Sequence, residues 1–343
     1  MNIQKDIPWI HSVRVLACVM VVMLHSLPPI YEFECEGVDL SFLMMVSAFT
    51  RPCVPLFFMI TGYLILPYKQ DDAFSFYKKR IPRVYFPLLI WSIVYAILPY
   101  LLGMYGSQVM MKELLFSLIK MPGRIGALLW YIFILIGIYL FIPFITKEIY
   151  YNRKIIASYL CLWFVSSLVF VLKYYEKELL GQCLLHQFDM LIYFSGYFGY
   201  LLLGYYIKRW GFPMPKSICP VGGGKMIVFV LYLMLLVFSY IHPMVSNRFL
   251  SCFVVAMTTC VFVLIKDIPI CDSVYSLLKI VSQFTFGIYL VHMVVFRCVT
   301  IHLYRLFGTG WYIQCSVMIA TFLLSLLATM ALSKIPYKRY IIG

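Results

Sequence analysis

Two basic residues, Arg14 and His25, lie within the first long apolar stretch of the chain, from Trp9 to Leu27. An arginine at membrane depth costs roughly 2.5–3.5 kcal/mol on insertion scales, so it is retained only where it has a partner or a task. The eleven helical steps between the two residues make about three turns, which places both on one face, roughly 16 Å apart along the axis. The pattern therefore predicts a site that combines a fixed cation with a titratable imidazole.

Two further ionisable residues, Arg51 and His292, fall inside apolar segments, whereas all 14 acidic residues fall in loops or at segment edges. Arg51 lies near the middle of the second segment, where the prolines that follow it free backbone carbonyls that it can satisfy. His25 and His292 are both predicted in the outer half of the membrane. Simpler roles compete with a site: Arg14 can snorkel to the inner headgroups, and a lone intramembrane histidine is often a packing residue. The absence of intramembrane carboxylates disfavours a proton-coupled transporter.

The composition is that of a polytopic membrane protein. Of the 343 residues, 63% are hydrophobic and 12% are charged, whereas a soluble domain is nearer 45–50% apolar and 25% charged. The net charge of +14 is explained by membrane sidedness, and because no nucleic-acid motif accompanies it, we expect no nucleic-acid partner. The 11 cysteines show no metal-ligand spacing, so no metal is expected. Only Cys35 and Cys183, both in predicted loops, are candidates to pair.

Hydropathy predicts an all-α protein with about ten transmembrane helices in a single domain, residues 1–343. The predicted spans are 9–28, 41–67, 84–103, 126–145, 155–172, 190–207, 226–242, 250–265, 276–296 and 311–332. Lysine and arginine mark the cytoplasmic loops. The loop after the first span holds acidic residues without lysine or arginine and should face outward, while the loop after the second span is strongly basic. Both termini are therefore predicted in the cytoplasm.

A cytoplasmic basic cluster opens the third predicted span, with the pattern Arg80-x-x-Arg83 beside Pro82. Basic inner loops are routine, so sidedness alone can account for the charges. Two guanidiniums fixed by a stiffened helix start can, however, grip a phosphate or pyrophosphate. We expect Arg80 and Arg83, with Arg14, to act as counter-charges to a phosphorylated substrate.

Several of these segments, in matching order, resemble the acyltransferase 3 family of integral-membrane acyltransferases. They are Arg14-x10-His25, residues 51–63 with Thr61 in place of the more usual serine, Arg80-x-x-Arg83, residues 129–132, and residues 287–292 with Tyr289 and His292. No extracytoplasmic hydrolase-like domain is appended, so the chain resembles the stand-alone form.

The resemblance implies a membrane O-acyltransferase of a bacterial inner or cytoplasmic membrane. It would move an acyl group, most often acetyl, from cytoplasmic acyl-CoA to a hydroxyl of a cell-surface or lipid-linked glycan. The expected partners are acetyl-CoA, the glycan acceptor and membrane lipids. Such a transfer needs a base for the hydroxyl and a donor for the oxyanion. We expect His25 to be the base, with Arg51, Tyr289 or His292 as the oxyanion donor or as the group that orients His25. An acetyl-histidine intermediate is the alternative route.

Two other functions remain open at this point. A transporter or flippase for a glycan or lipid-linked intermediate should show related helix halves and coupling residues, and the sequence shows no evident internal repeat. A scaffold role leaves the intramembrane arginines and histidines unexplained.

Overall fold

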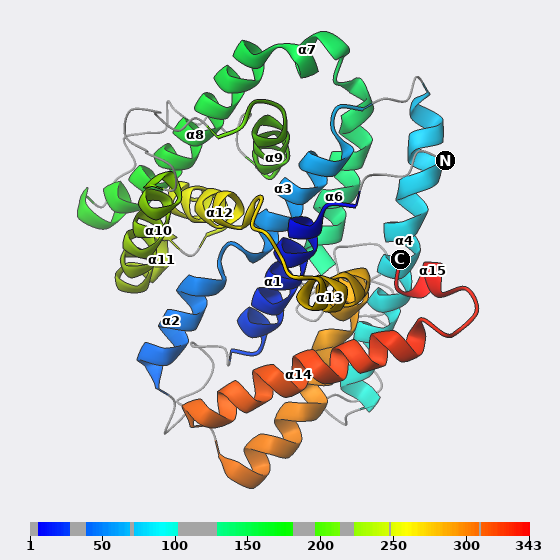
Figure 1. The fold of residues 1–343 in the computed structure, drawn as a ribbon. Helices are drawn as coiled ribbons and strands as arrows, with labels where there is room; N and C mark the ends of the chain where they lie inside the picture. The colour runs from blue at the N-terminus through cyan, green and yellow to red at the C-terminus, as the bar shows by residue number, and fades with distance from the viewer. Residues whose placement is uncertain are drawn as a thin grey trace. The chain divides into compact units, whose positions relative to one another are not determined.

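The structure is a computed structural model that describes residues 6–27, 39–68, 72–101, 129–180, 196–212, 223–246, 248–308 and 310–343. The regular elements among these residues are helices (Figure 1). The chain divides into two compact units. The first unit comprises Met1–Pro67 and Thr146–Ser282, and the second comprises Tyr68–Ile145 and Gln283–Gly343.

Seven helical segments within the described ranges, one of them interrupted, are long and apolar enough to cross a membrane. They are Pro8–His25, Leu40–Ile65, Ala73–Ile97, Arg153–Lys173, Gly224–Ile241, Asp272–Phe307 and Trp311–Leu332. Each overlaps a span predicted from hydropathy, so the all-helical membrane class is confirmed. Two shorter apolar helices, Trp130–Phe144 and Cys252–Ile265, overlap two more of the predicted spans.

The first unit contains the break that prolines predict in the second span. Its elements are α1 (Pro8–His25), α2 (Leu40–Thr50), α3 (Cys53–Ile65), α7 (Lys147–Tyr151), α8 (Arg153–Leu180), α9 (Phe198–Trp210), α10 (Gly223–Ile241), α11 (Pro243–Ser246), α12 (Cys252–Ile265) and the start of α13 (Asp272–Phe307). The apolar run 41–67 is thus two helices separated by Arg51 and Pro52. Proline lacks the N–H that would continue the ladder, which is why α2 ends at this point.

Two glycines let α3 and α9 approach closely in the first unit (Figure 1). A Cβ at Gly62 would overlap the carbonyl of Leu201, and a Cβ at Gly204 would overlap the carbonyl of Met59. Helices in lipid gain little from hydrophobic burial against each other, so small residues that permit close packing decide which faces meet. Gly62 and Gly204 therefore set the contact between α3 and α9.

Trp9 anchors the start of α1 to two neighbouring helices. Its ring lies 5.0 Å from the ring of Tyr63 on α3 and 5.3 Å from the ring of Phe262 on α12, both edge to face. Pro8 occupies the first turn of α1, where a missing N–H costs nothing. These contacts hold the first turn of α1 in place.

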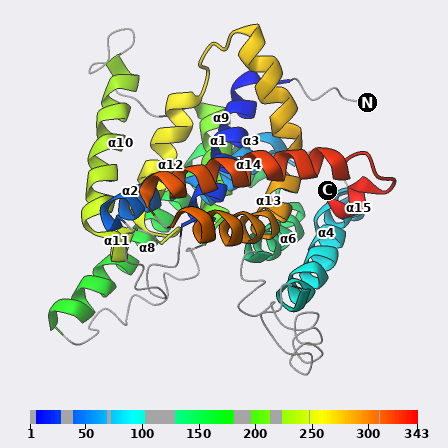
Figure 2. The ribbon, with the colours of Figure 1, turned by 90° about the horizontal axis from the view of Figure 1, so that it is seen from below.

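The second unit packs the latter part of α13 against α14 (Trp311–Leu332), and the two run side by side in Figure 2. Its other elements are α4 (Ala73–Leu101), α6 (Trp130–Phe141), η2 (Ile142–Phe144) and α15 (Lys338–Ile341). A Cβ at Gly287 would overlap the methyl group of Thr329, so this glycine permits the close crossing of α13 and α14. The C-terminal segment is tied to α4 because the indole N–H of Trp91 donates to the carbonyl of Ile341 at 2.9 Å.

Candidate active site

Arg14 and His25 both lie on α1 in the first unit, and both side chains are half-buried. Cys18, which lies between them on the same face, is only 1% exposed. His25 occupies the last turn of α1, and the backbone N–H of the following Ser26 donates to the carbonyls of Val22 and Met23. The carbonyl end of a helix favours a positive charge, so this position suits a histidine that accepts a proton during a reaction.

Arg51 lies in the break between α2 and α3, also in the first unit. Its Nη2 donates to the hydroxyl of Ser47, one turn earlier on α2, at 2.5 Å. The sequence predicted carbonyl partners near the prolines, so the hydroxyl of Ser47 is a partner that the sequence did not indicate. The guanidinium is half-buried and held by its own helix end, which suits a fixed positive charge.

Arg80 and Arg83 lie on α4 in the second unit, with different surroundings. The Arg80 guanidinium carbon lies 5.1 Å from the ring centre of Phe76, one turn earlier, and 5.9 Å from that of Tyr139 on α6. Aromatic faces attract a guanidinium and restrict its motion. Arg83 is exposed and one turn further along the helix, so the pair presents one held and one accessible guanidinium.

Tyr289 and His292 lie one turn apart on α13, in the second unit. His292 is 1% exposed, and its Nδ1 lies 2.6 Å from the carbonyl oxygen of Tyr289. The ring of Tyr289 lies 5.7 Å from that of Tyr131 on α6, at 71°. The tyrosine thus orients the imidazole through its backbone while its own ring is held by α6.

Tyr95 is a neighbour of this pair that sequence reasoning missed. Its hydroxyl donates to the carbonyl of Leu290 at 2.5 Å, and the side chain is 3% exposed. Tyr131 and Tyr139, which contact Tyr289 and Arg80, were missed as well. Tyr131 lies in the matched segment 129–132, which was a usable signal, whereas nothing in the sequence marked Tyr95 or Tyr139.

The structure thus gathers the predicted residues into two sets. Arg14, His25 and Arg51 belong to the first unit, where α1 packs against α2 and α3. The second unit holds the other four, which are Arg80, Arg83, Tyr289 and His292. Cys35 and Cys183 lie outside the described residues. Within the described ranges, no group of three or more His, Cys, Asp or Glu side chains is placed to hold a metal ion.

This geometry defines a class of protein: a helical membrane protein with arginines and histidines inside its spans. A comparison with known protein families identifies one family: residues 7–330 match the acyltransferase 3 family, described as an acyltransferase domain. The protein belongs to this family, and it is a membrane acyltransferase. No curated protein and no solved structure matches the chain.

Proposed function

We propose that the protein transfers an acetyl group from cytoplasmic acetyl-CoA to a hydroxyl of a cell-surface or lipid-linked glycan. The observation that carries this proposal is the shared face of Arg14 and His25 on α1, in a chain that belongs to an acyltransferase family. The face supplies a fixed cation and a proton acceptor, which are the two groups that acyl transfer to a hydroxyl requires.

The proposed topology has ten spans, with both termini in the cytoplasm of a bacterial cell. The bias of lysine and arginine supports it. In this topology α4 begins at the cytoplasmic face, where Arg80 and Arg83 meet a soluble donor. Acetyl-CoA carries a 3′-phosphate and a pyrophosphate, which two guanidiniums one turn apart can bind.

In the proposed reaction, neutral His25 takes the proton of the acceptor hydroxyl as the oxygen attacks the thioester carbon. A carbon–oxygen bond forms, the carbon–sulfur bond breaks, and the departing CoA thiolate receives the proton from the imidazolium. Arg51 and Tyr289 are the candidates to stabilise the oxyanion that forms in between, and His292 is the candidate to orient His25. The two-step alternative places the acetyl group on His25 before the hydroxyl attacks.

Donor binding tests the proposal without knowledge of the acceptor. We expect acetyl-CoA to raise the melting temperature of the purified protein in detergent, and the double variant Arg80→Ala/Arg83→Ala to lose this stabilisation. The matched control is Lys78→Ala/Lys79→Ala, because both lysines are exposed on the same turns of α4. Dephospho-CoA shows whether the 3′-phosphate contributes. A folded wild type that does not bind acetyl-CoA would overturn the proposal in favour of a transporter.

A further inference from the structure

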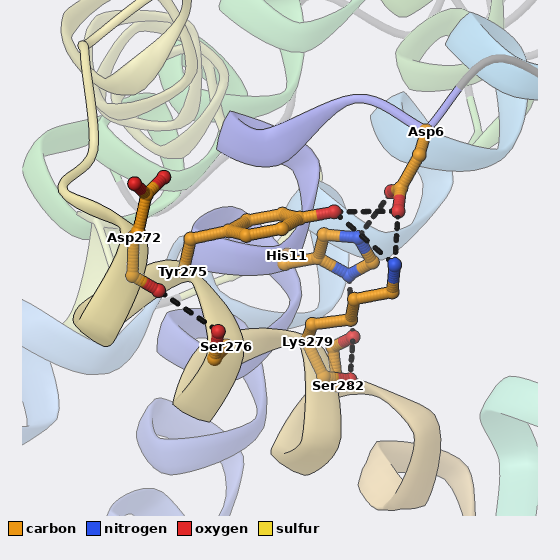
Figure 3. A network of polar contacts seen from close by, with 7 residues as sticks. All are labelled: Asp6, His11, Asp272, Tyr275, Ser276, Lys279 and Ser282. Carbon is orange, nitrogen blue, oxygen red and sulfur yellow. Dashed lines mark hydrogen bonds and ion pairs between the residues drawn. The ribbon is translucent and has the colours of Figure 1, made fainter.

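A network of polar contacts in the first unit joins the segment before α1 to the start of α13 (Figure 3). The carboxylate of Asp6 accepts from three groups: His11 Nε2 at 2.7 Å, the Tyr275 hydroxyl at 2.5 Å and Lys279 Nζ at 2.6 Å. On its other side, His11 Nδ1 lies 2.5 Å from the hydroxyl of Ser282. His11 therefore bridges Asp6 and Ser282.

The charge of Asp6 is fixed by this network. The ammonium of Lys279, followed by the hydroxyl of Tyr275 and the imidazole of His11, holds the pKa of the Asp6 carboxyl well below its usual range. Asp6 is therefore a carboxylate at neutral pH, and the segment before α1 carries a permanent acceptor for groups on α1 and α13.

The order Asp6, His11, Ser282 has the composition of a hydrolase triad, but its surroundings do not suit a nucleophile. Ser282 lies inside a continuous helix, is 4% exposed, and its hydroxyl also lies 3.0 Å from the carbonyl of Lys279. Backbone N–H groups inside a helix are already bonded, so they cannot form an oxyanion hole. The network connects helices and does not form a second catalytic centre.

The bridge accommodates the imidazole in more than one hydrogen-bonding arrangement. When Nδ1 carries no proton, the Ser282 hydroxyl donates to it, and Nε2–H donates to Asp6. When both ring nitrogens carry a proton, Nδ1–H donates to Ser282, whose hydroxyl donates to the carbonyl of Lys279, and Nε2–H still donates to Asp6. Both arrangements keep His11 attached at each end.

A polar bridge between α1 and α13, such as the one His11 makes, restricts the rotation of α1 about its own axis. At 100° per residue, His11, Arg14, Cys18 and His25 fall within about 60° of arc, so one stripe carries all four. Apolar contacts specify the rotation of a helix weakly in lipid, because lipid tails are as apolar as the neighbouring helix. Polar contacts between helices specify the rotation better, and His11 makes such a contact at the N-terminal end of the stripe.

We propose that Asp6 and His11 are positioning residues for the proposed acyl transfer. They fix the rotation of α1 about its axis, and thereby the direction in which Arg14 and His25 point. The role rests on the proposed function, since it assigns a task to the face on which that function depends. Neither residue touches the substrate.

The test compares Asp6→Asn and His11→Ala with matched controls. Asp72→Asn makes the same change at an exposed carboxylate before α4, where Asp72 accepts from the backbone of Phe74 and Ser75. His302→Ala removes an exposed histidine of α13. Two quantities are measured in native membranes: incorporation of radiolabelled acetyl from acetyl-CoA into envelope glycan, and the rate at which N-ethylmaleimide alkylates Cys18, read by mass spectrometry.

We expect both network variants to lower the maximal rate of acetyl incorporation at least 10-fold, with the apparent KM for acetyl-CoA within about 2-fold of wild type. Alkylation of Cys18, which is 1% exposed, should become several-fold faster as the stripe turns. Asp6→Glu, which restores the carboxylate, should recover both quantities, and the two controls should match wild type.

The outcomes separate the two proposals. Unchanged acetyl incorporation in both network variants would overturn the positioning role, and so would lost incorporation with Cys18 still protected. A wild type that incorporates no acetyl overturns the proposed function, while Cys18 alkylation still reports on rotation. If His11→Ala does not fold, Ser282→Ala replaces it, because that variant removes one end of the bridge and keeps the imidazole.

Discussion

The Nδ1 atom of His292 lies 2.6 Å from the carbonyl oxygen of Tyr289, one turn earlier on α13. A carbonyl can only accept, so Nδ1 carries the proton, and in the neutral imidazole Nε2 carries the lone pair. The backbone of α13 thus fixes the tautomer of the neutral His292 side chain.

The variant His292→Asn distinguishes the roles of the two ring nitrogens. The asparagine amide can still donate near the Tyr289 carbonyl, but nothing replaces Nε2. We expect acetyl incorporation to fall by about 10²-fold, in the range of acid–base contributions, with protein level unchanged. The control is His302→Asn, because His302 is an exposed histidine of the same helix whose Nδ1 lies 2.7 Å from the carbonyl of Cys298. Equal activity in the two variants would remove His292 from the site.

Gly62→Ala tests the contact between α3 and α9. The added methyl group would overlap the carbonyl of Leu201, which is backbone and cannot turn aside. We expect a destabilisation of about 1–3 kcal/mol, as for other overpacked positions, seen as a lower melting temperature in detergent. Gly137→Ala on α6 is the control, since a Cβ there meets nothing within 4 Å. A similar melting temperature for both variants would contradict the close packing.

Gly287→Ala tests the crossing of α13 and α14, and here the structure supplies a rescue. The added Cβ would overlap the Cγ2 methyl group of Thr329, which Thr329→Ser removes while it keeps the hydroxyl. We expect Gly287→Ala to lower the melting temperature and the double variant to recover most of the loss. Strictly additive effects of the two changes would show that the methyl group is not the obstacle.

Acid should weaken the Asp6 network. The pKa of Asp6 is lowered in the folded protein, so its contribution to stability is present above the unfolded pKa of about 4 and is lost as the pH falls through the folded value. The melting temperatures of wild type and Asp6→Asn should therefore differ most near neutral pH and converge below about pH 4. A difference that stays constant down to pH 3 would mean that the Asp6 charge contributes nothing.

The lengths of the apolar segments and the positions of the prolines predicted most of the fold. The second span breaks at Arg51 and Pro52 because proline removes the N–H, which is a local rule. Local rules predicted the end of a helix less accurately where a charged side chain is hydrogen-bonded to a residue far away in the sequence. The predicted span 190–207 ends before Lys208, yet α9 continues to Trp210, with Lys208 Nζ donating to the carbonyl of Leu66 at 2.9 Å.

The candidate residues could be predicted only where an ionisable side chain is unusual because it lies inside a membrane span. Arg14, His25, Arg51 and His292 stand out because charge at membrane depth is costly. His11 lies at the start of the same stripe, but its importance depends on Asp6 and on Ser282, which lies 271 positions away in the chain. A contact at that separation comes from tertiary packing, which spacing along the chain does not reveal.

His25→Ala tests the central claim most directly, with wild type and His302→Ala measured beside it. In native membranes supplied with radiolabelled acetyl-CoA, we predict that His25→Ala incorporates no acetyl above background, while the purified variant still binds acetyl-CoA and keeps its melting temperature. His302→Ala should match wild type. Acetyl incorporation by His25→Ala at the wild-type rate would contradict the account.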